Sequence, residues 1–201
     1  MFFVFSALFL SFVMKKIVIG LIGEKGSGKG TVAKYLMEKY DATHYGTSKI
    51  LKRTIESLHI PASRENFIKL ALILKNGFWS SVVIDALIKD IENNGGGIII
   101  ADGIRMHGDV EPFRKKYGKN FYLVYVTADI KLRFKRTKLR KEKAGEDKTT
   151  FEEFLAQESE LTEVSIHEIG KQADFVIKNN KTAKELDQQT EMVIKKIIGK
   201  K

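Results

Sequence analysis

A glycine-rich loop at residues 23–31, Gly-Glu-Lys-Gly-Ser-Gly-Lys-Gly-Thr, constrains the fold of this chain more than any other feature of the sequence. It follows an apolar run at 17–22, which is typical of a buried strand in a parallel sheet. It precedes apolar residues at helical spacing, which are Val32, Ala33, Leu36 and Tyr40. A strand, a glycine-rich loop and a helix in this order predict a phosphate cradle, where N–H groups at the start of the helix surround the phosphates.

The spacing of the loop is that of a P-loop, G-x-x-x-x-G-K, carried by Gly23, Gly28 and Lys29. We expect Lys29 to neutralise the β- and γ-phosphates of a nucleotide. The hydroxyl that usually follows this lysine and reaches Mg²⁺ is replaced by Gly30 and comes one place later, at Thr31. A Rossmann dinucleotide loop is disfavoured because it needs a glycine at the position of Thr31. The residues expected to bind the nucleotide are Gly23, Gly26, Ser27, Gly28, Lys29, Gly30 and Thr31.

A second apolar run, at 98–101, ends in Asp102-Gly-Ile-Arg105. If this strand is a neighbour of the first, Asp102 and Arg105 lie at the carboxyl ends of the strands, where such sheets bind ligands. Asp102 is then expected to hold Mg²⁺ through water, and Arg105 to grip a phosphate of the acceptor. The alternative, a turn-capping aspartate and a surface salt bridge, is disfavoured by the nearby loop.

The loop resembles the P-loop of adenylate kinase and other nucleoside monophosphate kinases, where a glycine and then a threonine follow the lysine. The segment 102–105 is similar to the Asp-Gly-Phe-Pro-Arg of those kinases without its proline. It looks still more like the Asp-Gly-Ile-Arg of small P-loop kinases related to dephospho-CoA kinase and deoxynucleotide kinases. The resemblance runs from about residue 15 to the C-terminus. It implies ATP and Mg²⁺ as cofactors and an α/β/α P-loop fold with a mainly parallel five-stranded sheet, a helical acceptor-binding insertion and a basic lid.

Helical and strand patterns alternate along the rest of the chain without a linker or a repeat, which predicts a single α/β domain over 14–201. Capping boxes at Thr150 with Glu153, and at Thr182 with Glu185, indicate two helix starts. The expected strands are 17–22, 43–46, 98–101, 121–127 and 175–178. The first helix is expected to end near Tyr40. Further helices are expected at 47–59, 63–75, 80–92, 108–117, 129–141, 150–168 and 182–198.

The resemblance places the acceptor-binding insertion at 46–92. Thr47 and Arg64 are the preferred contacts with the acceptor, and Arg64 starts a helix, where a phosphate or ribose is well placed. Ser48, Lys52 and Arg53 are further candidates. For any one of these five residues, Thr47 and Arg64 included, a solvated helix face is an equal alternative. The pair Phe78-Trp79 could stack on a base, but an aromatic pair at a helix start is more typical of the core.

The segment 131–150 resembles the arginine-bearing lid of these kinases. Arg133, Arg136 and Arg140 are spaced i, i+3 and i+7, which predicts that three guanidinium groups face one site. The alternative is a solvated face or a nucleic-acid patch. Residues 141–148 would form the tip of the lid. Near the C-terminus, 173–180 resembles the last strand and loop of dephospho-CoA kinase, where adenine packs, which makes Asn179 a nucleotide contact.

The composition agrees with this interpretation. The 201 residues, 43% of them hydrophobic, suffice for one core, and the absence of cysteine excludes disulfides and suits the cytoplasm. A net charge of +10 favours anionic partners, either phosphorylated small molecules or nucleic acid. The apolar run at 2–13 is shorter than the roughly 20 residues of a membrane span. We expect translation to begin at Met14; the alternative is a membrane-surface anchor.

The predicted activity is transfer of the γ-phosphoryl group of Mg-ATP to a small phosphorylated acceptor, a nucleoside or deoxynucleoside monophosphate. An anionic acceptor needs no strong base, so positioning and charge neutralisation by Lys29, Arg105, Arg136 and Arg140 would suffice. Dephospho-CoA kinase is the alternative in the same class, and its base would have to be Asp41, which is poorly placed. A regulatory nucleotide-binding protein that contacts RNA is the alternative from another class, and a GTPase is disfavoured because Asn-Lys-x-Asp is missing.

Overall fold

The computed structural model describes residues 16–93, 96–140, 149–159 and 161–199. The expectations for residues 1–13 and for the lid tip at 141–148 lie outside these ranges. Within them, the element order is the alternation of strands and helices that the sequence predicts.

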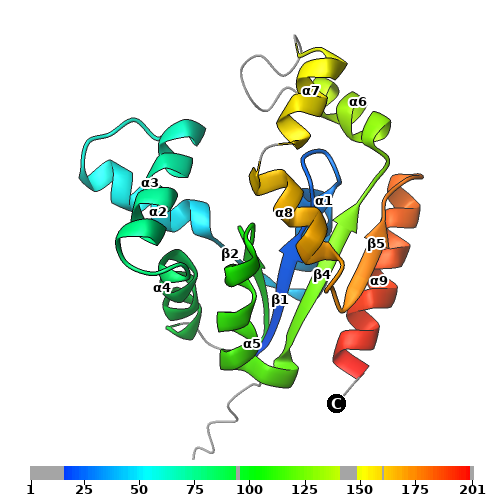
Figure 1. Cartoon of the computed structure of the whole chain (residues 1–201). Helices are drawn as coiled ribbons and strands as arrows, with labels where there is room; N and C mark the ends of the chain where they lie inside the picture. The colour runs from blue at the N-terminus through cyan, green and yellow to red at the C-terminus, as the bar shows by residue number, and fades with distance from the viewer. Residues whose placement is uncertain (1–15, 94–95, 141–148, 160, 200–201) are drawn as a thin grey trace, which may run out of the picture.

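The centre of the fold is a parallel sheet of five strands in the order β2-β3-β1-β4-β5 (Figure 1). The register aligns Asp102 of β3 with Leu21 of β1 and with Gly46 of β2. The carboxyl ends of these three strands therefore meet at one edge, where the glycine-rich loop also begins. The strands are β1 (Ile17–Ile22), β2 (Thr43–Gly46), β3 (Ile98–Asp102), β4 (Phe121–Thr127) and β5 (Phe175–Lys178).

Helices cover both faces of the sheet and make a three-layer fold (Figure 1). One core cluster joins the sheet to α1 (Lys29–Tyr40) and α9 (Ala183–Gly199). The other joins it to α4 (Val82–Glu92), α5 (Glu111–Tyr117) and α8 (Leu161–Gly170). All six residues of β1 are buried, as expected for a central parallel strand covered on both faces. The predicted fold class is confirmed.

Four helices extend beyond these layers at the carboxyl edge of the sheet (Figure 1). These are α2 (Thr47–Ser57), α3 (Arg64–Gly77), α6 (Ile130–Arg140) and α7 (Phe151–Glu158). Helix α3 begins close to the start of the helix expected at 63–75, because the Ser63 hydroxyl caps it by accepting a hydrogen bond from the Asn66 N–H at 3.1 Å. Helix α3 contacts α2 and α4, but none of its residues is buried.

Two predicted helices are interrupted. The helix expected at 150–168 is two helices, α7 and α8, and its first part ends at Ser159, whose hydroxyl donates to the Leu155 carbonyl and so competes with the helical bonds. The helix expected at 108–117 begins instead as a 3₁₀ turn, His107–Asp109, before α5, because Pro112 can occupy only the first turn of an α-helix.

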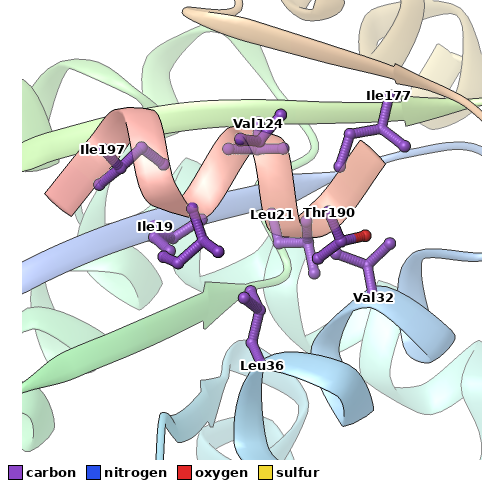
Figure 2. Close-up of a pocket in the computed structure, with 10 residues that line it drawn as sticks. Ile19, Leu21, Val32, Leu36, Val124, Ile177, Thr190 and Ile197 are labelled. Atoms are coloured by element: carbon purple, nitrogen blue, oxygen red, sulfur yellow. The ribbon is translucent and has the colours of Figure 1, made fainter. Parts of the chain in front are cut away.

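The pocket drawn in Figure 2 lies inside the core, between α9 and the sheet, on the face that carries α1. Ile19, Leu21, Val124 and Ile177 contribute from three strands, and the lining contains no charged side chain. An apolar gap of this kind stays dry, so we regard it as a packing feature and not as a ligand site.

No single helix in the described ranges has both the length and the apolar character needed to cross a bilayer. Helices α3 and α4 taken together meet the length and composition criterion, but the chain bends by 100° between them.

Candidate active site

The glycine-rich loop leaves β1 and turns into α1 as predicted. Gly26 and Gly28 have positive φ angles of 78° and 98°, and the first turn of α1 closes with the Thr31 and Val32 N–H groups bonded to the Gly28 carbonyl. Gly30 and Thr31 are exposed, and a side chain at Gly30 would meet no atom within 4 Å. The N-terminal end of α1 is thus open on the side where a phosphate group would approach.

Gly23 and Ser27 lie on the inner side of the loop. The Ser27 side chain is fully buried, and a Cβ at Gly23 would stand 2.6 Å from its hydroxyl oxygen. The Ser27 N–H donates to the Glu24 carbonyl at 3.1 Å and the Ser27 carbonyl accepts from the Asn179 amide, so both backbone groups are also bonded within the protein, which places a limit on its predicted role.

Asn179, at the end of β5, braces the loop. Its side-chain amide donates to the Ser27 carbonyl at 2.8 Å, and its own carbonyl accepts a hydrogen bond from the Arg136 guanidinium at 2.9 Å. The structure thus brings together the loop, Arg136 of α6 and Asn179, which are far apart in the sequence. Asn179 itself is buried, so its side chain contacts the loop rather than open space.

Arg133 does not share a site with Arg136, and the predicted face of three guanidinium groups is wrong in this respect. Its guanidinium is buried, pairs with Glu158 at 2.5 Å and donates to the Lys25 carbonyl of the loop at 3.3 Å. The spacing predicts the three arginines on one side of α6, but it does not predict that Glu158 of α7 forms an ion pair with Arg133. The backbone of Arg140 ends α6, and its side chain lies outside the described part of the structure.

Lys29 and Asp102 face each other across the edge of the sheet. Their ammonium and carboxylate groups are 2.5 Å apart, and Asp102 also lies 3.5 Å from the Nε2 atom of His44 on β2. Burial alone would raise the pKa of Asp102, but hydrogen bonds from His44 and Lys29 and the Lys29 charge hold that pKa well below its ordinary value. Asp102 is therefore a carboxylate at neutral pH, as a magnesium-binding role requires.

The depressed pKa of Asp102 predicts a pH-dependent stability. A carboxyl group with a lowered pKa in the folded state stabilises the fold above its unfolded pKa of about 3.9, and this contribution is lost as the pH falls toward the folded pKa. We expect Asp102→Asn to lower the free energy of unfolding at pH 7 by about 1 kcal/mol, since the pair is partly exposed. Urea unfolding at pH 7 and pH 3 should show this difference shrinking at pH 3; a difference independent of pH would contradict the assignment.

Arg105 and Thr47, the two predicted acceptor contacts nearest this pair in the fold, lie on and against the turn that follows Asp102. Arg105 is exposed on the turn that follows β3, and its N–H donates to Asp109 at 2.9 Å. Thr47 starts α2 and abuts the same turn, because a Cβ at Gly103 would stand only 1.9 Å from its hydroxyl oxygen. Both candidates therefore border the edge of the sheet where Lys29 and Asp102 meet.

Arg64 is placed less favourably. Lys75, near the other end of α3, lies against Asp109 and so marks the end of the helix close to Arg105. Arg64 lies eleven residues earlier, about 16 Å away along an α-helix. Of the weaker candidates, Lys52 and Arg53 form surface ion pairs with acidic residues of α2 and α4.

The aromatic pair Phe78-Trp79 is exposed, and its interpretation as core is wrong. Phe78 and Trp79 are 67% and 54% exposed in the turn between α3 and α4, and the Trp79 N–H donates to Asp85 at 2.7 Å. Among the described residues, no element covers the two rings.

Glu24, in the second position of the loop, was not anticipated. Its carboxylate is buried and accepts a hydrogen bond from the Tyr125 hydroxyl, and the Nδ1 atom of His167 lies 3.5 Å from the same hydroxyl. Burial, followed by the bond to Glu24, raises the pKa of Tyr125. A glutamate in a glycine-rich loop gives no sequence signal of burial. The pairing of His44 with Asp102 was also not anticipated, because the strand pattern at 43–46 does not show which residue lies opposite His44.

Residues 22–154 match the AAA domain family, and this range spans the loop, the Asp102–Arg105 turn and α6. The chain belongs to the AAA domain family. The resemblance to P-loop kinases is confirmed by this match together with the folds of solved structures. This AAA domain shares its fold with shikimate kinase from Bacteroides thetaiotaomicron (TM-score 0.59, 13% identity, 91% of this chain and 98% of that one). A gluconokinase from Sinorhizobium meliloti has a TM-score of 0.57 and 9% identity, over 92% of this chain and 94% of that one.

Archaeal proteins are similar to this AAA domain over most of their length. The UPF0200 protein PH1008 of Pyrococcus horikoshii is 27% identical over 185 residues, which cover 90% of this chain and 98% of that protein. The UPF0200 protein SSO1041 of Saccharolobus solfataricus is 26% identical over 184 residues, which cover 90% and 94% respectively.

Proposed function

We propose that the protein is a phosphotransferase that moves the γ-phosphoryl group of Mg-ATP to a nucleoside or deoxynucleoside monophosphate. The observation that carries this proposal is the meeting of Lys29, at the start of α1, with Asp102, at the end of β3, beside the turn that bears Arg105. A nucleotide-binding lysine and an acceptor-binding arginine then border a common edge of the sheet.

The residues present fit a nucleotide with its metal ion. Positive-φ glycines and the open N-terminal end of α1 suit a polyphosphate, and the ionised Asp102, with Thr31 exposed in the first turn, suits a cation that prefers oxygen ligands. Bound Mg²⁺ would supply positive charge to the phosphate oxygens. Lys29 would neutralise the β- and γ-phosphates, Arg105 would orient the acceptor phosphate, and Arg136 and Arg140 of the lid would neutralise charge on the transferring group.

The placement of carboxylates favours a phosphate acceptor over a hydroxyl. Asp41, the base that a dephospho-CoA kinase would require, caps the end of α1 before β2 begins. Since β2 runs parallel to β1, its start lies at the opposite edge of the sheet from the loop. Asp102 has a pKa held well below its ordinary value, so its carboxylate is a weak proton acceptor at neutral pH. A monophosphate is already anionic and needs no base, so positioning suffices.

The test is a screen of purified protein with Mg-ATP and single acceptors, with ADP release and product mass as readouts. We expect turnover with at least one nucleoside monophosphate. Turnover only with dephospho-CoA, or only with hydroxyl acceptors such as shikimate or gluconate, would contradict the acceptor class. Salt-sensitive RNA binding without phosphotransfer would support the regulatory alternative instead.

Removal of the metal ion gives a separate prediction. Adding EDTA in excess over Mg²⁺ should abolish product formation, because the cation neutralises phosphate charge that the protein side chains alone do not balance. Activity should return when Mg²⁺ is restored. Full activity in EDTA would contradict the metal assignment of Asp102 and Thr31.

A further inference from the structure

Asp109 organises the turn that carries Arg105. This aspartate is only 2% exposed, and its Oδ2 atom accepts hydrogen bonds from the N–H groups of Arg105 at 2.9 Å and of Met106 at 3.0 Å. Two backbone donors on one buried carboxylate oxygen fix the path of the chain just after β3. The direction in which Arg105 leaves the backbone therefore depends on Asp109.

The other oxygen of the same carboxylate holds helix α3. Its Oδ1 atom lies 2.6 Å from the Lys75 ammonium group, and the Lys75 side chain is only 13% exposed. Helix α3 has no buried residue, so this ion pair with a buried carboxylate helps to anchor it to the body of the fold. Lys75 and Asp109 are 34 positions apart, and one carboxylate joins both segments.

We propose that Asp109 and Lys75 are positioning residues that lock helix α3, which belongs to the predicted acceptor-binding insertion, to the turn bearing Arg105. The inference rests on the proposed function, because it gives the pair a role in acceptor binding. If α3 and Arg105 both contact the acceptor, a rigid link between them reduces the conformational entropy lost on binding. Neither residue needs to touch the acceptor itself.

The first measurement is hydrogen exchange of the protein in the absence of substrates. Asp109→Asn preserves the size of the side chain but leaves it a single acceptor oxygen. If that oxygen accepts the two N–H bonds, the new NH₂ group faces the Lys75 ammonium, and two donors then oppose each other. We expect peptides covering 103–108 to exchange about 10-fold faster or more. Unchanged exchange in this segment would overturn the inference.

The second measurement separates the link from the turn. Lys75→Met keeps the Asp109 bonds to Arg105 and Met106 but removes the anchor of α3, so exchange should rise in α3 more than in 103–108. In the Lys75→Met protein, the KM for the nucleoside monophosphate that the wild-type protein phosphorylates should rise about 10-fold, while the KM for ATP should change less than about 2-fold. Lys75→Arg should restore most of the loss, because it keeps the charge.

Lys69→Met is the matched control, since Lys69 is an exposed lysine of the same helix. It should leave both KM values and the exchange rates unchanged. Equal effects of Lys69→Met and Lys75→Met would overturn the proposed link. If the wild-type protein phosphorylates no acceptor, the proposed function fails and the role in acceptor binding fails with it. The exchange measurements still decide whether the pair joins the turn to α3.

Discussion

Replacing Lys29 by alanine is expected to lower ATP-dependent phosphotransfer by at least about 100-fold, because a single preorganised donor to a charged transition state contributes about that much. Lys29 is the first residue of α1, and its ammonium group lies at the edge of the sheet where Asp102 ends β3. Arg136 and Arg133 are held elsewhere, the first by the Asn179 carbonyl and the second by Glu158, so neither can take the place of Lys29 without moving.

The variant should remain folded. Lys29 is partly exposed and its partner Asp102 keeps His44, so the cost in stability is expected to be about 1 kcal/mol. Turnover should be measured with saturating ATP and acceptor, and folding by circular dichroism and urea unfolding. The loss should appear in kcat and not only in the KM for ATP, because the lysine would act on the transferring group.

Lys34→Ala provides the control. Lys34 is an exposed lysine of the same helix, paired with Glu38 at 3.6 Å, and its removal should leave turnover unchanged. A Lys29→Ala protein with wild-type turnover would refute the assignment of the loop as a catalytic phosphate site.

The sheet was predictable because its strands carry their own signal. The apolar run at 17–22 is β1 with the same bounds, and the strands expected at 121–127 and 175–178 also match. Fully buried parallel strands read as continuous apolar runs, and short turns separate them from helices. The strand expected at 98–101 lacks only Asp102, which pairs with both neighbours.

The contacts between helices were less predictable, because they depend on where each helix packs. The spacing of Arg133 and Arg136 predicts that both lie on one side of α6. It does not predict that Glu158, which lies on another helix, forms an ion pair with Arg133 while Arg136 binds elsewhere. The sequence does not predict the Lys75–Asp109 ion pair either, since a lysine on a helix is usually solvated. Local patterns identify elements, while buried polar pairs belong to the tertiary structure.

The site was predictable where backbone geometry determines it. Glycines with positive φ and the start of α1 follow from the order of strand, loop and helix, so the loop has the backbone geometry and the place that the motif predicts. Asn179 was expected at the nucleotide because of a resemblance, but its observed role is to brace the loop from beneath. A motif predicts which backbone surrounds a ligand better than which side chains support that backbone.

Gly26→Ala is expected to lower the free energy of unfolding by about 3 kcal/mol, from the left-handed backbone and from steric conflict together. Gly26 has a φ angle of 78°, and a Cβ there would stand 2.5 Å from the Arg133 carbonyl oxygen. That oxygen belongs to the backbone of α6, which cannot yield as a flexible side chain would. Helix α6 must therefore move away from the loop and take Arg136 with it, so ATP affinity should also fall.

Gly30→Ala, four residues further along the same segment, should have the opposite effect on stability. Gly30 lies in the first turn of α1, and a Cβ there meets no atom within 4 Å, so alanine is favoured by up to about 1 kcal/mol through its helix propensity. Urea unfolding of both variants without nucleotide measures the contrast directly. Since the two substitutions add the same methyl group, only the backbone angle and the approach of α6 distinguish them. A Gly26→Ala protein as stable as the wild type would contradict the backbone angle of Gly26 and the approach of α6 to the loop, and a destabilised Gly30→Ala protein would contradict the open position of Gly30 in α1.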